Sequence, residues 1–121
     1  MATPESKVKA HVKRILSRHV VNYVFMPATH GYGASGVPDI VACINGIFVA
    51  VECKANGNRP TALQKRNLHQ IVAAGGHAFV VDESSTGVFA MTLDRVVYMK
   101  APPELHDFTV LTNEEEQGEN K

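Results

Sequence analysis

The chain lacks the features that mark membrane, secreted or zinc-stabilised proteins. No apolar run of about 18 residues occurs, which argues against a membrane span. The basic start is not followed by an apolar segment, so no signal peptide is indicated. Two cysteines, Cys43 and Cys53, are too few for a disulfide framework and lack the spaced partners of a zinc site. We therefore expect a soluble cytoplasmic protein with reduced thiols.

The chain also has no net charge, but its charged residues are distributed unevenly along the sequence. Residues 1–100 hold eleven Lys or Arg against six Asp or Glu, whereas residues 101–121 hold one against six. A basic body suits a polyanionic partner such as nucleic acid, although an excess of about five charges is modest. The length and a hydrophobic content of 45% predict one domain over residues 1–112. Residues 113–121 contain no apolar side chain and are predicted to be a disordered acidic tail.

The pattern of apolar residues and turn signals predicts alternating helices and strands. Thr3 and Pro4 begin a helix as N-cap and first helical residue, and Thr61 begins a second. The helices should bury two stripes: Val8, Val12, Ile15 and Leu16, then Leu63, Leu68, Ile71 and Val72. Strands are predicted at 20–26, 39–44, 47–54 and 77–81, and 91–99 is a helix or a strand followed by a helix. The order α-β-β-β-α-β predicts an α/β fold, a mixed sheet with a central hairpin flanked by helices.

A glycine-rich segment precedes the hairpin. Gly31, Gly33 and Gly36 match G-x-G-x-x-G, the pattern of dinucleotide-binding loops. That function requires a helix to begin there, so that its N-terminus can hold the pyrophosphate. Val37-Pro38 and the strand pattern that follows exclude such a helix, and we expect no nucleotide cofactor.

The hairpin register follows from the turn Asn45-Gly46, because both residues tolerate positive φ. With a two-residue loop, residues whose numbers sum to 91 lie opposite each other, which pairs Asp39 with Glu52. Lys54 then lies on the same sheet face as these carboxylates, by strand alternation. Cys43 shares that face and Cys53 points to the other, towards the core, so an intrahairpin disulfide is not expected.

Opposed carboxylates are destabilising, and something positive is expected between Asp39 and Glu52. Two hard oxygen ligands at this separation suit a divalent cation such as Mg²⁺. Lys54 could position or deprotonate an attacking water, or stabilise charge on a phosphate. Each residue alone also fits a strand start or a solvated edge, but together they match the needs of phosphodiester hydrolysis.

Pro38-Asp39 followed by Glu52-x-Lys54 is the PD-(D/E)XK nuclease signature. The preceding glycines, the Asn-Gly hairpin, Thr61-Ala-Leu-Gln64 and Ala73-Ala-Gly-Gly76 resemble a stand-alone VRR-NUC domain of phage or bacterial type, over about residues 5 to 82. The resemblance implies a restriction-endonuclease-like core and Mg²⁺- or Mn²⁺-dependent cleavage of DNA by a homodimer similar to Holliday junction resolvases.

The same resemblance implies the residue roles. Asp39 and Glu52 would bind the metal together with the backbone carbonyl of Cys53, and Lys54 would act on the water or the phosphate. Gln64 matches a glutamine at the edge of the site, but Thr61-x-x-Gln64 is equally a capping box. Glu5 matches an acid that completes the metal shell, and it also suits the first turn of a helix.

The predicted DNA contacts are basic and loop residues. In the loop, Tyr32 and Ser35, with His30, precede Asp39 and could meet the DNA backbone. Two other functions remain open: a restriction-type duplex endonuclease, for which no base-reading element is recognisable, and a non-catalytic DNA-binding module of the same fold. The basic candidates are Lys7, Lys9, Lys13, Arg14, Arg59, Lys65 and Arg66.

Overall fold

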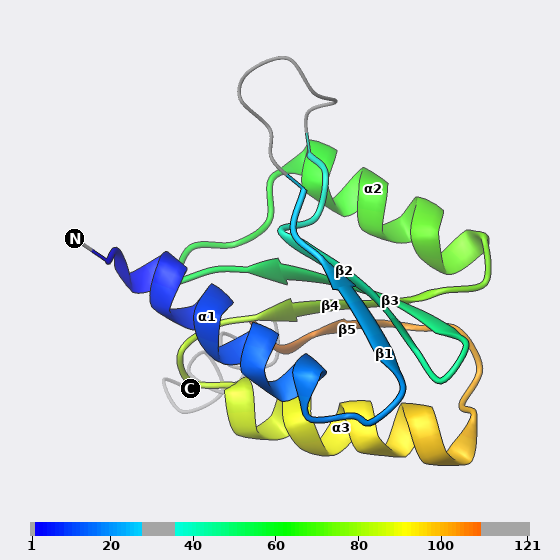
Figure 1. Cartoon of the computed structure of the whole chain (residues 1–121). Helices are drawn as coiled ribbons and strands as arrows, with labels where there is room; N and C mark the ends of the chain where they lie inside the picture. Colours follow the sequence, from blue (N-terminus) through cyan, green and yellow to red (C-terminus); the bar gives the residue numbers. More distant parts are fainter. Residues whose placement is uncertain (1, 28–35, 110–121) are drawn as a thin grey trace, which may run out of the picture.

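The computed structural model describes residues 2–27 and 36–109 (Figure 1). The strands of these residues form one sheet in the order β1-β2-β3-β4-β5, antiparallel from β1 to β3 and parallel from β3 to β5. It is a mixed sheet with the hairpin β2-β3 at its centre, as the sequence predicts. The elements are α1 (Pro4–Ser17), β1 (Asn22–Phe25), β2 (Ile40–Ile44), β3 (Ile47–Cys53), α2 (Ala62–Ala73), β4 (His77–Val81), α3 (Thr86–Met99) and β5 (Leu105–Asp107).

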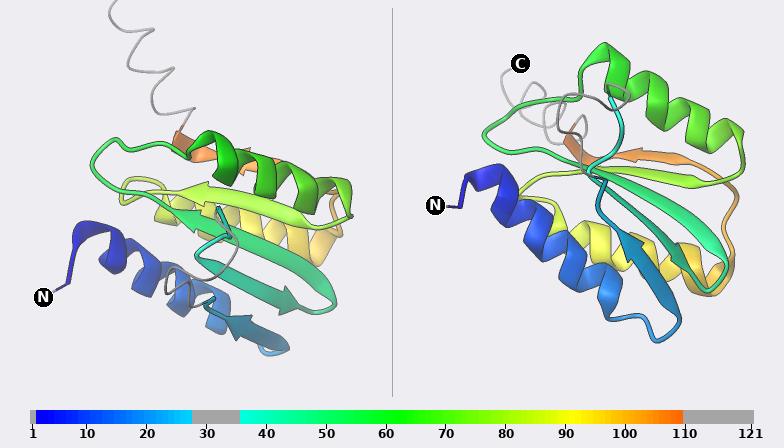
Figure 2. Two further views of the ribbon diagram at one scale, coloured as in Figure 1. Left: turned by 90° about the horizontal axis from the view of Figure 1, so that it is seen from above. Right: turned by 45° about the horizontal axis from the view of Figure 1, so that its top comes forward.

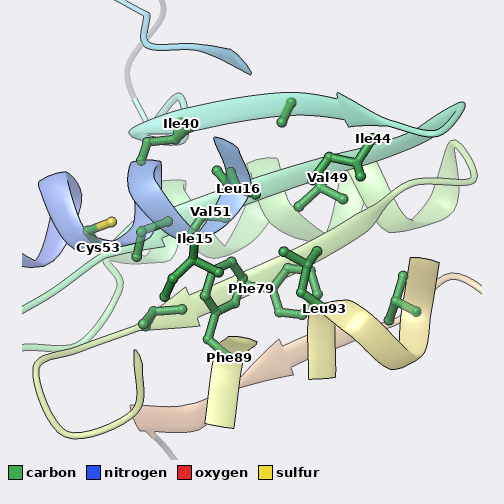
Figure 3. Close-up of a cluster of buried hydrophobic side chains, with 14 of the residues drawn as sticks. Ile15, Leu16, Ile40, Ile44, Val49, Val51, Cys53, Phe79, Phe89 and Leu93 are labelled. Carbon is green, nitrogen blue, oxygen red and sulfur yellow. The ribbon is translucent and has the colours of Figure 1, made fainter. Parts of the chain in front are cut away.

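Helices cover the two faces of the sheet unequally (Figure 2). α1 and α3 pack on one face, over the larger core, which includes Ile40, Val51, Phe79 and Leu93 (Figure 3). α2 packs on the other face, against β3, β4 and β5, over a smaller cluster of Leu68, Ala78 and Val80. Alternation along each strand therefore sends odd-numbered β3 residues into the larger core and even-numbered ones towards α2.

The start of α1 follows the predicted capping pattern. The Thr3 hydroxyl accepts a hydrogen bond from the Ser6 N–H at 3.1 Å, and Pro4 is the first helical residue. The predicted stripe of α1 is buried in full: Val8, Val12, Ile15 and Leu16. This packing fixes the first turn of α1, and with it Glu5, against the sheet.

The hairpin has the predicted register. Asn45 and Gly46 have φ of 51° and 83°, and Ile44 lies opposite Ile47. The pairing continues to Ile40 opposite Val51, so every pair of numbers sums to 91. The next pair beyond the last rung is Asp39 and Glu52.

The cysteines lie on the predicted faces. Cys53 is buried in the larger core with Val49 and Val51, and Cys43 is exposed on the opposite face. Both thiols are free.

Gly36 leads the chain into the site through a close approach to α2. Its φ is +80°, and a Cβ at this position would lie 2.8 Å from the Leu63 carbonyl oxygen and 2.8 Å from the Asn67 amide nitrogen. Glycine is therefore required both by the backbone conformation and by the space. β2 begins shortly afterwards at Ile40, close to the start of the strand that the sequence predicts there.

Some predicted elements differ from the structure. β1 spans Asn22–Phe25 only: Val20 and Val21 are exposed, and Val21 adds a single backbone hydrogen bond, in which its carbonyl accepts from the Asn45 N–H at 2.9 Å. In the predicted stripe of α2, Leu68 is buried, Ile71 and Val72 are partly buried, and Leu63 is exposed. The ambiguous segment 91–99 belongs to a single helix, α3.

The C-terminal part of the sheet was not predicted. β5 is a short strand that pairs in parallel with β4, so the element order is α-β-β-β-α-β-α-β. The predicted tail at 113–121 lies outside the described residues. Within the described ranges, no helix is long and apolar enough to span a membrane.

Candidate active site

Three carboxylates converge where β2 and β3 separate. Glu5 comes from the first turn of α1, Asp39 directly precedes β2, and Glu52 is the penultimate residue of β3. One carboxylate oxygen of each lies within 4.8 Å of the other two. The fold thus brings together acids that are 34 and 13 residues apart in the chain.

Asp39 is held by the backbone of the neighbouring strand. The backbone ladder between β2 and β3 ends at Ile40 and Val51. Beyond that rung, Asp39 Oδ2 accepts a hydrogen bond from the Cys53 N–H at 2.8 Å. Its other oxygen, Oδ1, lies 3.5 Å from Lys9 Nζ in an ion pair. One oxygen of Asp39 therefore accepts a hydrogen bond from the backbone of β3, and the other lies beside the positive charge of Lys9.

Glu52 is almost fully buried, with 2% of its surface exposed. Its Oε1 accepts a hydrogen bond from Gln64 Nε2 at 3.2 Å and lies 3.8 Å from Lys54 Nζ. Burial, then the negative charge of Asp39, raises the pKa of Glu52 to about 8, and Lys54 offsets only part of this shift. Without a cation the carboxyl is therefore mostly protonated at neutral pH.

The second oxygen of Glu52 indicates what the site is built to hold. Glu52 Oε2 is buried and has no hydrogen-bond partner among the described residues. Buried polar atoms are nearly always partnered, so an orphaned carboxylate oxygen beside two further carboxylates indicates a missing positive group. Three hard oxygen donors fit Mg²⁺ or Mn²⁺, and Glu5, Asp39 and Glu52 would hold the ion.

The sequence that forms this site matches a known protein family. The sequence matches, over residues 6–100, the family described as "Archaeal holliday junction resolvase (hjc)". The chain belongs to this resolvase family. The matched range includes Asp39, Glu52, Lys54 and Gln64.

Two further relatives are similar to this member of the resolvase family. A protein of Acyrthosiphon pisum secondary endosymbiont phage 1, described as "Putative nuclease p44", is 45% identical over 51 residues. That stretch is 41% of this chain and 55% of the phage protein, so the match spans about half of the relative's length. A solved "VRR_NUC domain" superposes with a TM-score of 0.58 at 22% identity, covering 79% of this chain and 96% of that domain. The predicted VRR-NUC-like, restriction-endonuclease-like fold is confirmed.

The Gln64 side chain makes one hydrogen bond within the cap of α2 and one with Glu52. Its side-chain Oε1 accepts a hydrogen bond from the Thr61 N–H at 2.9 Å, which completes the capping box of α2. Its Nε2 donates to Glu52 Oε1. One amide group thus caps the helix with its oxygen and orients a carboxylate with its nitrogen.

Lys54 is buried, and its backbone N–H is bonded to the Val81 carbonyl at 2.9 Å. That bond to β4 fixes the backbone from which the ammonium reaches Glu52. Burial, Asp39 and Glu52 raise the pKa of the Cys53 thiol above its ordinary value, so this cysteine stays a neutral core residue. The Cys53 carbonyl as a metal ligand remains a prediction.

Of the predicted basic DNA contacts, Lys9 lies in the site, beside Asp39, and the others are exposed. Among them, Lys7 lines a cavity of about 340 Å³ between α1 and α3, with His11 and Glu83. Tyr32 and Ser35 lie outside the described residues. The other basic candidates are exposed: Lys13, Arg14, Arg59, Lys65 and Arg66.

Lys9 is a site residue that the sequence did not single out. Its basic side chain predicts a DNA contact, but its ammonium pairs with Asp39. The available signal was its spacing: Lys9 is four residues after Glu5, so both lie on one face of α1. Two lysine ammonium groups therefore lie beside the acids of the metal-free site: Lys9 Nζ is 3.5 Å from Asp39 Oδ1, and Lys54 Nζ is 3.8 Å from Glu52 Oε1.

We expect Lys9→Met to bind Mn²⁺ more tightly than the parent. The Lys9 ammonium competes with a cation for Asp39, and a partly exposed pair of this kind contributes about 0.2 to 1 kcal/mol, which corresponds to a gain of up to about fivefold. Isothermal titration calorimetry measures the affinity. Lys13→Met, one turn further along α1 and exposed, is the control and should leave the affinity unchanged. A lower affinity in Lys9→Met would show that Lys9 supports the cation site.

Proposed function

We propose that the protein is a metal-dependent, structure-selective DNA endonuclease that hydrolyses phosphodiester bonds as a homodimer of Holliday-junction-resolvase type. The observation that carries the proposal is the convergence of Glu5, Asp39 and Glu52 within 4.8 Å, with Lys54 beside them. Membership of the resolvase family supports DNA as the substrate.

The carboxylates of Asp39 and Glu52 are held in fixed orientations by hydrogen bonds from the protein. Asp39 and Glu52 each commit one oxygen to the protein, to the Cys53 N–H and to Gln64 respectively. Their orientations are thereby set before substrate arrives, which reduces the ordering needed at the moment of reaction. A divalent cation bound by these acids would place positive charge against the phosphodiester oxygens and lower the pKa of an attacking water.

Lys54 supplies the remaining function from within the protein. Its ammonium, mostly screened from solvent and 3.8 Å from Glu52 Oε1, can stabilise negative charge on the phosphate or take part in proton transfer from water. Exposed cations on α1, α2 and the segment between Lys54 and Gln64 would contact the DNA backbone. Such contacts position a duplex and do not read its sequence.

The purified protein should cut DNA with Mg²⁺ or Mn²⁺ and should not cut with EDTA. The test uses four-way junctions, flaps, splayed arms and plain duplex of matched sequence, and product ends are mapped on gels. Paired nicks in four-way junctions are the expected result. Cleavage of unbranched duplex at one short sequence would favour the restriction-type alternative, and metal-independent binding without any cleavage would favour the non-catalytic one.

A further inference from the structure

The Lys9 ammonium lies on the oxygen of Asp39 that a metal ion would use. Asp39 has two carboxylate oxygens, and Oδ2 accepts the hydrogen bond from the Cys53 N–H. The other oxygen, Oδ1, lies 3.5 Å from Lys9 Nζ. An ion held by Glu5, Asp39 and Glu52 would be bound through the oxygen that the backbone does not engage. Lys9 and the ion therefore compete for Asp39 Oδ1.

Of the two lysines beside the acids, Lys9 is the one that can leave. Two cations within a few Å of each other repel, and the repulsion is stronger at a partly buried carboxylate than in water. The Lys9 side chain is 33% exposed, and its ammonium ends a flexible four-carbon stem. The Lys54 side chain is only 10% exposed and lies beside the buried Glu52. Binding of an ion to Asp39 should therefore turn Lys9 outwards and leave Lys54 in place.

In the metal-loaded site, the charge of Lys9 is not balanced by an acid. Carboxylates bind metals in their ionised form, so Glu5, Asp39 and Glu52 would present three negative charges. A divalent ion and Lys54 together match these charges. Within residues 2–27 and 36–109, the pair with Asp39 is the one ion pair that Lys9 makes. Once that pair opens, the Lys9 ammonium is a surplus cation on the solvent side of the site.

We propose that Lys9 is an exchangeable cation, which pairs with Asp39 until a divalent ion binds and then binds a DNA phosphate at the edge of the site. The inference rests on the proposed function, which supplies both the ion and the DNA. Lys9 follows Glu5 by about one helical turn on the same face of α1, so its ammonium lies on the side of the metal ligands. Each DNA strand carries a phosphate per about 3.4 Å of helix axis, so phosphates beside the cut position pass close to Lys9.

This exchange makes the binding of metal and the binding of DNA depend on each other. Lys9 becomes free for a phosphate only when an ion has taken Asp39, and DNA that holds Lys9 removes the competitor of the ion. Such coupling is reciprocal, so each ligand raises the affinity for the other by the same factor. The protein would therefore bind DNA most tightly when its site is loaded for cleavage.

The first test measures how DNA affinity depends on salt, with Ca²⁺ and with EDTA. Ca²⁺ binds carboxylate oxygens, fluorescence anisotropy follows a labelled four-way junction, and a denaturing gel shows that the DNA is intact. One phosphate contact contributes about 0.9 to the slope of log affinity against log salt concentration. With Ca²⁺, the slope of Lys9→Met should be smaller than that of the parent by this amount, and in EDTA the two slopes should agree.

The difference is large enough to measure directly. Between 50 and 200 mM salt with Ca²⁺, the parent should lose about three- to fourfold more affinity than Lys9→Met, because one contact is broken by salt in the parent alone. Lys9→Arg keeps the positive charge and should restore the slope of the parent. Circular dichroism confirms that both variants fold.

Lys13→Met is the matched control. Lys13 lies one turn beyond Lys9 on the same helix and is exposed. As a predicted DNA contact away from the acids, it should lower the slope equally with Ca²⁺ and in EDTA. If Lys9→Met behaves like Lys13→Met, Lys9 is an ordinary backbone contact and the exchange is wrong. Equal slopes for Lys9→Met and the parent under both conditions would exclude the phosphate contact altogether.

Calorimetry tests the reciprocal effect. The four-way junction should raise the Ca²⁺ affinity of the parent by a larger factor than that of Lys9→Met, and the excess should equal the one seen in DNA binding at the same salt concentration. An equal gain in both proteins would overturn the exchange, since Lys9 would then not link the two ligands.

The outcomes separate this inference from the proposed function. A salt slope that depends on Lys9 only with Ca²⁺, in a protein that cuts no DNA with Mg²⁺ or Mn²⁺, would overturn the endonuclease proposal and leave the exchange at Lys9 standing. Metal-dependent cleavage by a protein whose salt slopes do not depend on Lys9 would do the reverse.

Discussion

Lys54→Ala should slow DNA cleavage by about a hundred- to a thousandfold under single-turnover conditions with saturating metal. Lys54 Nζ is the cation nearest Glu52, and alanine removes it from a buried position that solvent cannot refill with equal charge. The affinity for Mn²⁺ should change far less than the rate, because Lys54 is not itself one of the oxygen donors. Quench-flow or gel assays on a four-way junction give the rate, and calorimetry gives the affinity.

Two further substitutions define what Lys54 does. Lys54→Arg keeps the charge but cannot exchange its proton at neutral pH, so partial rescue by arginine would indicate charge stabilisation and no rescue would indicate proton transfer. Arg95→Ala removes an exposed cation from α3 and should cut like the parent. If Lys54→Ala cuts as fast as Arg95→Ala, the catalytic role of Lys54 is wrong.

Glu52→Gln should weaken Mn²⁺ binding at least about a hundredfold, the upper range measured for residues that only support metal ligands. Glu52 supplies the buried oxygen without a partner, and a neutral amide cannot replace a carboxylate as a donor to a hard cation. Added Mn²⁺ should accordingly raise the unfolding midpoint of the parent and leave that of Glu52→Gln unchanged. Equal stabilisation of both proteins would exclude Glu52 from the ion's ligands.

The same substitution should change how stability depends on pH. The pKa of Glu52 is about 8 in the folded protein against an ordinary value of 4.5, so the folded state holds this proton more tightly than the unfolded state. Its stabilising contribution is complete below pH 4.5 and is lost as pH rises to about 8. The metal-free parent should therefore lose on the order of a few kcal/mol across this window, and Glu52→Gln should lose much less.

Urea unfolding in EDTA at several pH values measures this dependence. Glu83→Gln, at an exposed acid outside the carboxylate cluster, serves as the control and should follow the parent. A parent whose stability is flat from pH 4.5 to 8 would contradict the protonated state of Glu52.

The sequence predicts the features that depend on residues close together in the chain. Asn45-Gly46 sets a two-residue turn, and the turn alone fixes which residues of β2 and β3 oppose each other. The Asp39–Glu52 pair and the faces of the two cysteines follow from that register without knowledge of any other element. The capping residues Thr3 and Thr61 likewise bind the backbone N–H only three residues further along the chain.

Features that depend on packing between distant elements could not be predicted in the same way. Lys9 resembles any lysine on a solvated helix until α1 is placed against Asp39. β5 has three residues, Leu105-His106-Asp107, whose strand conformation comes from pairing with β4 and not from their own preferences. Val20 and Val21 have strand-forming side chains, yet both are exposed and the paired strand begins only at Asn22.

Because Gln64 makes one hydrogen bond to the helix cap and one to Glu52, few other residues could replace it at this position. A glutamate could still cap α2 through Thr61, but it would bring a fourth negative charge towards Glu5, Asp39 and Glu52. An alanine would leave the Thr61 N–H and Glu52 Oε1 without this partner. If the protein is the proposed nuclease, selection for folding and selection for catalysis therefore act on one amide group. An inactive variant at residue 64 must be checked for loss of helix stability before its defect is assigned to chemistry.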